Sequence, residues 1–92
     1  MEKLTAIYNK EELAWETAEV VLKRDIYLMV TLNKPGKLVI RQRTQDGKFP
    51  RVPIKRHKDM RIFKLRIIVL PESVGIKIFT STEPKEVKYA YI

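Results

Sequence analysis

The chain has 92 residues, of which 45% are hydrophobic and 33% charged; it contains no cysteine and carries a formal net charge of +8 at pH 7. This length fits a single domain over residues 1–92, because domains typically contain about 100–150 residues. The composition excludes a disordered or fibrous chain, and the lack of cysteine excludes disulfides, thiolate zinc sites and cysteine nucleophiles. No apolar run has the length of a signal peptide or of the ~20 residues of a spanning helix, so we expect a cytoplasmic protein.

The clearest predicted element is a helix over residues 10–24, which follows a first strand at residues 3–8. Asn9 is a favourable N-cap, and Glu12 follows three residues later, as in a capping box. At about 100° per residue, one arc of this helix is apolar and the opposite stripe is mainly acidic. The apolar arc holds Ala14, Trp15, Ala18, Val21 and Leu22, and the opposite stripe holds Glu12, Glu16, Glu19 and Lys23. We therefore expect Trp15 and Leu22 to insert against a sheet.

After the helix the hydrophobic period changes to two, which indicates strands. Residues 26–33 and 38–44 are predicted to be two strands joined by a type II turn, in which Pro35 presets φ and Gly36 supplies a positive φ. The second of these strands would then return alongside the first.

The second half of the chain continues as strands separated by turns. Residues 46–47 form an Asp-Gly turn signal, and residues 49–54 contain two prolines, which predict an edge strand or an irregular loop. Further strands are predicted at residues 60–70, 76–81 and 86–92, with turns at 71–75 and 83–84. The predicted fold class is α+β: one N-terminal amphipathic helix packed on one face of a mainly antiparallel five- to six-stranded sheet.

Alternation along the strands separates an apolar face from a basic one. Leu38 and Ile40 share a face, as do Phe63 and Ile67, and these sets belong under the helix. The uncovered face then carries Arg41, Arg43, Lys64, Arg66, Lys77 and Lys88, with Phe79 among them.

The positive charge is concentrated in one third of the sequence. Residues 34–66 hold twelve Lys or Arg against two Asp, which gives +10, while the rest holds seven basic and nine acidic residues, which gives −2. Like charges crowded together in a small domain repel one another, and an anionic partner would relieve this repulsion. The alternative is a solvated basic surface, but six of the twelve are arginine, which suits bidentate phosphate contacts.

These features predict a nucleic-acid interface made of a basic sheet face and a basic, proline-containing loop over residues 48–61. Cations would contact phosphates, and Phe79 would offer a ring for base stacking, although a lone aromatic on a strand is more often part of a core. The predicted interface residues are Arg41, Arg43, Lys48, Arg51, Lys55, Arg56, Lys58, Arg61, Lys64, Arg66 and Phe79.

The sequence carries no pattern for catalysis, a metal or another cofactor. His57 is the single histidine, and a metal site needs several ligands, so we interpret it as a solvated member of the basic loop. The glutamate stripe is interpreted in the same way, as a solvated helix face.

We therefore expect a small non-catalytic protein that binds nucleic acid, DNA or RNA, with weak sequence preference. The alternative is a protein-interaction module, an inhibitor or adaptor of the kind found in phages and mobile elements, which docks an acidic protein. Membrane binding is not expected because no basic amphipathic helix is present. A homodimer is compatible with either function.

Overall fold

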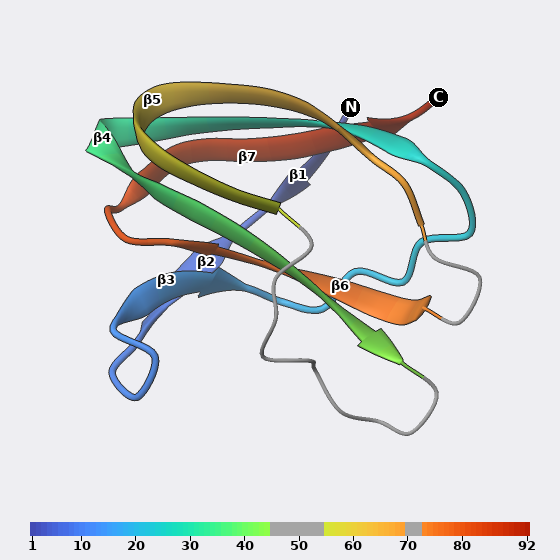
Figure 1. Ribbon diagram of the computed structural model, residues 1–92, viewed down its shortest axis with the longest axis horizontal. Helices are drawn as coiled ribbons and strands as arrows, with labels where there is room; N and C mark the ends of the chain where they lie inside the picture. The colour runs from blue at the N-terminus through green and yellow to red at the C-terminus, as the bar shows by residue number, and fades with distance from the viewer. Residues whose placement is uncertain (45–54, 70–72) are drawn as a thin grey trace.

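The computed structural model describes residues 1–44, 55–69 and 73–92, and for residues 44, 55–59, 73 and 74 it describes the backbone alone. Within these ranges the chain forms seven strands and no helix (Figure 1). The strands are β1 (Glu2–Leu4), β2 (Ala6–Asn9), β3 (Ala14–Thr17), β4 (Ile26–Thr44), β5 (Lys55–Ile67), β6 (Ser73–Thr80) and β7 (Pro84–Tyr91). The predicted α+β class is therefore wrong. This part of the chain also contains no helix long and apolar enough to cross a membrane.

The predicted helix at residues 10–24 is absent: Ala14–Thr17 form the strand β3, and Val20 makes an isolated bridge to Ile76. β2 and β3 form an antiparallel hairpin, and β3 pairs with β6, with Glu16 opposite Phe79. A helix of this length is marginal in water unless tertiary packing stabilises it. Here β6 offers an unpaired strand edge, and pairing with β3 satisfies the backbone groups of both strands.

The turn between β2 and β3 explains why the helix signals misled. Asn9 Oδ1 accepts hydrogen bonds from the backbone N–H groups of Glu11 at 2.9 Å and Glu12 at 3.2 Å. An N-cap makes this contact, but so does the side chain of an Asx turn. Leu13 then adopts a φ of 53°, a left-handed conformation that does not continue a right-handed helix. The same residues that resemble a helix start therefore close a hairpin.

The two apolar residues expected to lie under the helix have different surroundings. Trp15 is half-buried in the hairpin, and its ring meets that of Tyr8 edge to face with 5.5 Å between centroids. Leu22 is buried in the main core. The expectation is thus confirmed for the burial of Leu22, but without a helix to carry it.

β4 runs without interruption through residues 34–37, where the sequence predicts a turn. Its first half pairs with β7 and its second half with β6, so the two halves do not pair with each other. A Cβ atom on Gly36 would lie 2.6 Å from Thr82 Oγ1 and 2.7 Å from Ser81 Oγ. Glycine is therefore needed at this bend for the close approach of the β6–β7 connection, and not for a turn.

The bend in β4 wraps the sheet into a nearly closed, barrel-like shape (Figure 1). The strand order is β1-β7-β4-β6-β3-β2, and β5 pairs along the other edge of β4. One wall consequently contains residues 62–67 of β5, the first half of β4, β7 and β1, while the start of β5 pairs with the second half of β4. The other contains the second half of β4, β6, β3 and β2.

The core lies between these two walls and is built from the inward residues of alternating strands. The largest fully buried side chains include Phe63, Leu28, Leu32, Leu38 and Ile40. The predicted alternation of β4 and β5 is confirmed for the described side chains. Arg41, Lys64 and Arg66 point outward, whereas the buried residues include Leu38, Ile40, Phe63 and Ile67. The opposite wall of the barrel, and not a helix, covers the apolar face.

Most of the predicted strands are confirmed, but they begin and end at other residues than predicted. The first predicted strand is divided into β1 and β2, and the strand predicted at 60–70 extends back to residue 55 as β5. Residues 55–61 of the predicted basic loop thus belong to a strand. The turn predicted at residues 46–47 and the irregular segment at 49–54 lie outside the described residues.

Candidate nucleic-acid interface

The described cations of the predicted interface lie on the outer surface of the barrel, but on two different parts of it. We call the outer face of β5, the first half of β4 and β7 the open sector; it holds Tyr27, Met29, Lys64, Arg66 and Lys88. We call the outer face of the second half of β4 and of β6 the paired sector; it holds Val39, Arg41, Arg43, Lys77 and Phe79. The predicted single basic face is divided because β4 bends between its two halves.

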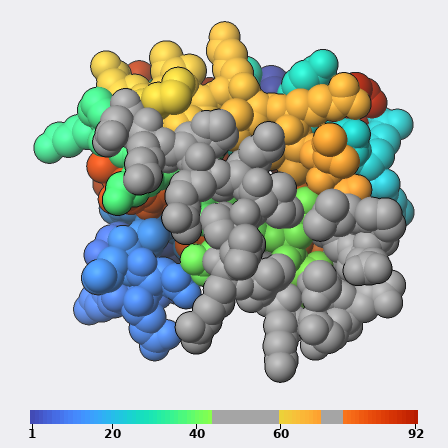
Figure 2. All heavy atoms as spheres, viewed as in Figure 1, coloured from blue at the N-terminus to red at the C-terminus, as the bar shows by residue number. Residues whose placement is uncertain are grey.

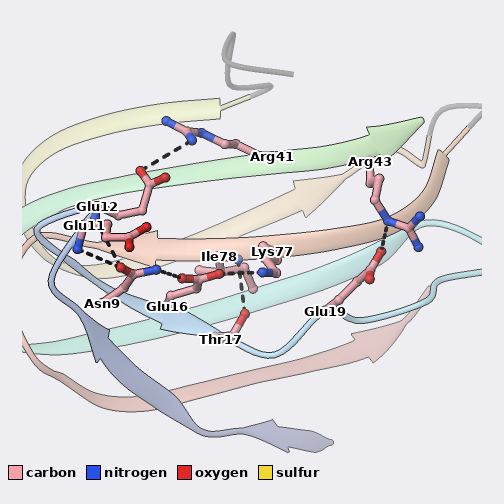
Figure 3. A network of polar contacts seen from close by, with 10 residues as sticks. All are labelled: Asn9, Glu11, Glu12, Glu16, Thr17, Glu19, Arg41, Arg43, Lys77 and Ile78. Carbon is pink, nitrogen blue, oxygen red and sulfur yellow. Dashed lines mark hydrogen bonds and ion pairs between the residues drawn. The ribbon is translucent and has the colours of Figure 1, made fainter. Parts of the chain in front are cut away.

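Two arginines of the paired sector lie beside glutamates of the N-terminal segment (Figure 3). Arg43 Nε donates a hydrogen bond to Glu19 Oε1 at 2.6 Å, and Arg41 Nη1 lies 3.7 Å from Glu12 Oε2. The Glu19 side chain lies directly over Gly75, where a Cβ atom would overlap its carboxylate. These glutamates were predicted to form a solvated helix face, but in the barrel they reach the neighbouring strands and neutralise the arginines.

Lys77, the third cation of the paired sector, also binds a glutamate of the N-terminal segment, Glu16. Its Oε1 accepts a hydrogen bond from Lys77 Nζ, and its Oε2 accepts one from Asn9 Nδ2, each at 2.6 Å (Figure 3). The Glu16 side chain is 15% exposed. The hydrogen bond from Lys77 lowers the pKa of Glu16; burial opposes this, while the Asn9 hydrogen bond and the charges of Lys77 and Arg41 reinforce it. Glu16 is therefore ionised at neutral pH and offsets the charge of Lys77.

Phe79, the predicted stacking residue, lies under this network. It is 8% exposed, and the guanidinium carbon of Arg41 is 5.0 Å from the centroid of its ring. One face of the ring is thus occupied by a cation–π contact. In this arrangement Phe79 presents little surface to a nucleic-acid base.

The open sector is less neutralised. Arg66 lies opposite Tyr27 and its side chain is 58% exposed, although its Nη2 is 3.4 Å from Asp25 Oδ2. Lys64 lies opposite Met29, is exposed, and makes no ion pair with a carboxylate in the described part of the chain. An exposed ion pair such as that of Arg66 contributes little free energy, so it is easily exchanged for a phosphate.

A row of lysines crosses four strands in this sector. Lys64 lies opposite Met29, Met29 opposite Lys88, and Lys88 opposite Lys3. Glu86 accepts a hydrogen bond from Lys88 at 3.0 Å and lies 3.8 Å from Lys3. Among the described residues, three ammonium groups therefore share this row with the Glu86 carboxylate. Figure 2 shows the described part of β5, in yellow and orange, along the top of the molecule, away from the blue N-terminal hairpin.

The remaining predicted interface residues belong to the basic stretch before residue 62. Arg61 is exposed in β5. Lys55, Arg56 and Lys58 are described by their backbone in β5 alone, and Lys48 and Arg51 lie outside the described residues. Their part in an interface stays a prediction.

Sequence reasoning missed Tyr27, which is 52% exposed between the cations of the open sector. The signal was available, because Tyr27 alternates with the buried residues Ile26 and Leu28 and must therefore point outward. The run of apolar residues around it predicted a strand, but no face was assigned to Tyr27. Only the pairing with β5 shows that Arg66 lies opposite Tyr27 and Lys64 opposite Met29.

Within residues 1–44, 55–69 and 73–92, no group of three or more His, Cys, Asp or Glu side chains is arranged to hold a metal ion. Comparison of the chain with protein-family models, with curated proteins and with solved structures gave no match. A function is therefore inferred from the arrangement of the side chains themselves.

Proposed function

We propose that this chain is a small non-catalytic nucleic-acid-binding protein and that the open sector makes its principal phosphate contacts. The observation that supports this most directly is the exposure of Lys64 and Arg66 on β5 beside an exposed tyrosine. Alternate strands of a sheet lie about 10 Å apart, so Lys64 and Lys88 present separate cationic points along one row. A polyanion lying across the strands meets several of them in succession.

The mode of contact predicts affinity without strong sequence preference. Phosphate contacts position a nucleic acid, whereas base edges specify its sequence. None of the described elements is a helix that could enter a major groove. A cytoplasmic location, which the sequence predicts, belongs to this proposal because DNA and RNA are accessible there.

The test is a titration of labelled single-stranded and duplex oligonucleotides at several salt concentrations, followed by fluorescence anisotropy. If about five phosphates are neutralised, log K should fall against log salt with a slope of roughly −3.5 for a single strand. Lys64→Ala with Arg66→Ala should reduce the magnitude of this slope by about 1.4. Absence of binding to every oligonucleotide at low salt would overturn the proposal.

A second candidate function is docking of an acidic protein. It is favoured by apolar side chains around the same cations, since Ile62 is 53% and Ile68 is 62% exposed. Protein interfaces combine an apolar centre with a charged rim in this way. Recovery from a lysate of one stoichiometric acidic partner that survives nuclease treatment, together with no oligonucleotide binding, would favour this function over the first.

A further inference from the structure

The surface around Tyr27 is hollowed as well as charged. A depression of about 320 Å³ lies at this place, and its lining includes Tyr27, Met29, Lys64, Leu65 and Arg66. Its floor is formed by the paired strands β4 and β5, and Met1 at the N-terminal end of the chain also lines it. The depression therefore combines an apolar floor with two cations at its rim.

Tyr27 differs from the other partly exposed tyrosines. Tyr8 packs edge to face on Trp15, and Tyr91 packs on Tyr89 and lies 5.0 Å from the guanidinium carbon of Arg24. Tyr27 has no such ring or cation partner among the described residues. Its ring is thus open to a ligand, and it does not serve a visible packing role on the outer face.

We infer that the Tyr27 depression receives an unpaired nucleobase, and that Lys64 and Arg66 bind the phosphates beside that base. This inference rests on the proposed function and gives it a substrate class: single-stranded nucleic acid in preference to duplex. In a duplex the faces of the bases are covered by their neighbours, so an aromatic ring on a flat sheet gains nothing from them. In a single strand every base offers a face for stacking.

The charge of the depression favours this occupant over a second copy of the chain. Lys64 and Arg66 line it, Lys88 lies opposite Met29 on the next strand, and the whole chain carries +8. Two such surfaces would repel each other on approach. A single-stranded nucleic acid complements both the charge and the apolar floor of the depression. Its phosphates neutralise the cations, and its planar bases can pack on the floor.

The experiment measures anisotropy of a labelled oligodeoxythymidylate, an oligouridylate and a duplex of the same length. The wild-type protein should bind both single strands more tightly than the duplex. Tyr27→Ala should weaken single-strand binding by roughly 5- to 100-fold and leave duplex binding within about twofold. Its salt slope should equal that of the wild type, because a stacking contact releases no counterions.

Three variants control this measurement. Tyr27→Phe keeps the ring and should bind like the wild type, and Tyr8→Ala removes a tyrosine from the distant β2 strand and should also leave binding unchanged. Tyr27→Thr keeps a strand-forming residue without the ring, so it should reproduce the loss even if the alanine variant proves unstable in thermal unfolding.

The outcomes separate this inference from the proposed function. Equal affinity for single strand and duplex, with Tyr27→Thr binding like the wild type, would overturn the inference and leave phosphate binding standing. Binding of none of the three oligonucleotides at low salt would overturn both. Loss of single-strand affinity in Tyr27→Thr with an unchanged salt slope would support both.

Discussion

The open sector and the paired sector lie on the two halves of one strand, yet their cations have different neighbours. In the paired sector, Arg43 and Lys77 each bind a glutamate at 2.6 Å. In the open sector, Lys88 binds Glu86 at 3.0 Å, Arg66 has a carboxylate at 3.4 Å, and Lys64 has none within the described residues. The difference arises because the N-terminal hairpin joins the sheet beside β6, and so brings its acids to one half of β4 only.

This comparison shows that the charge of a sequence segment does not by itself give the field at a surface. The second half of β4 and nearly all of β5 belong to the strongly basic middle of the chain, and the first half of β4 adjoins it. The surface potential also depends on which acidic residues, remote in sequence, the strand order places beside each face. Substitutions that change the charges of either sector should therefore change oligonucleotide binding, most strongly in the open sector.

Reversing the charge of the open sector should give the largest change. Lys64→Glu combined with Arg66→Glu should weaken oligonucleotide binding by roughly 100-fold at low salt, because two charge-assisted contacts become repulsive. Filter binding measures this loss. Lys10→Glu with Lys23→Glu changes the net charge equally at exposed positions and serves as the control. An equal loss in both double variants would show that only the overall charge matters.

Removing the acidic side chains beside the paired sector should make its cations more available to phosphates, as in the open sector. Glu12→Gln with Glu19→Gln removes the carboxylate charges 3.7 Å from Arg41 and 2.6 Å from Arg43. We therefore expect roughly tenfold tighter oligonucleotide binding and a salt slope steeper by about 1.4. Anisotropy at several salt concentrations measures both. The control is Glu2→Gln with Glu11→Gln, which removes the same charge elsewhere. Unchanged binding and slope in the first variant would argue against neutralisation by the hairpin.

Glu16 should matter for stability more than for binding. Glu16→Gln keeps the shape but removes a charge bonded to Lys77, so the free energy of unfolding should fall by about 1 kcal/mol at neutral pH. The pKa of Glu16 is held below its ordinary value of 4.5 in the fold. Its contribution is therefore complete above that ordinary value and is lost as the pH falls through the lower pKa of the folded state.

Urea unfolding at neutral pH and at several values below 4.5 tests this pH dependence. The wild type should lose stability on acidification, and the gap between wild type and Glu16→Gln should narrow. The exposed Glu11→Gln variant should follow the wild type at every pH. A constant gap over the whole range would contradict a role for the Glu16 charge.

The smallest effect is expected at the edge of the sheet. Lys3 Nζ lies 3.8 Å from Glu86 Oε2 at an exposed position, and Glu86 keeps its hydrogen bond to Lys88. Lys3→Ala should therefore change the free energy of unfolding by less than about 0.5 kcal/mol. Urea unfolding measures this change, and a larger loss would mean that β1 is held to β7 by this ion pair.

Part of the fold and of the interface was predictable from local patterns. Alternation in β4 and β5 correctly assigned Leu38 and Phe63 to the inside and Arg41 and Lys64 to the outside, because side-chain direction in a strand depends only on parity. The helix prediction failed because Asn9 can cap a helix or close a hairpin turn with the same hydrogen bonds, and the apolar residues that follow can pack in either structure. The choice between helix and hairpin depended on the unpaired edge of β6, which lies about 60 residues further along the chain.

The sequence alone determined the composition of the candidate interface: a basic middle third, outward cations on strands, and acids concentrated near the N-terminus. The tertiary structure decided which cations keep their charge available, because Coulombic neutralisation depends on distances between strands that are remote in sequence. It also placed Tyr27 beside Lys64 and Arg66 and buried Phe79 under Arg41. Cross-strand register sets these neighbours, and the bend at Gly36 sets which wall each half of β4 joins.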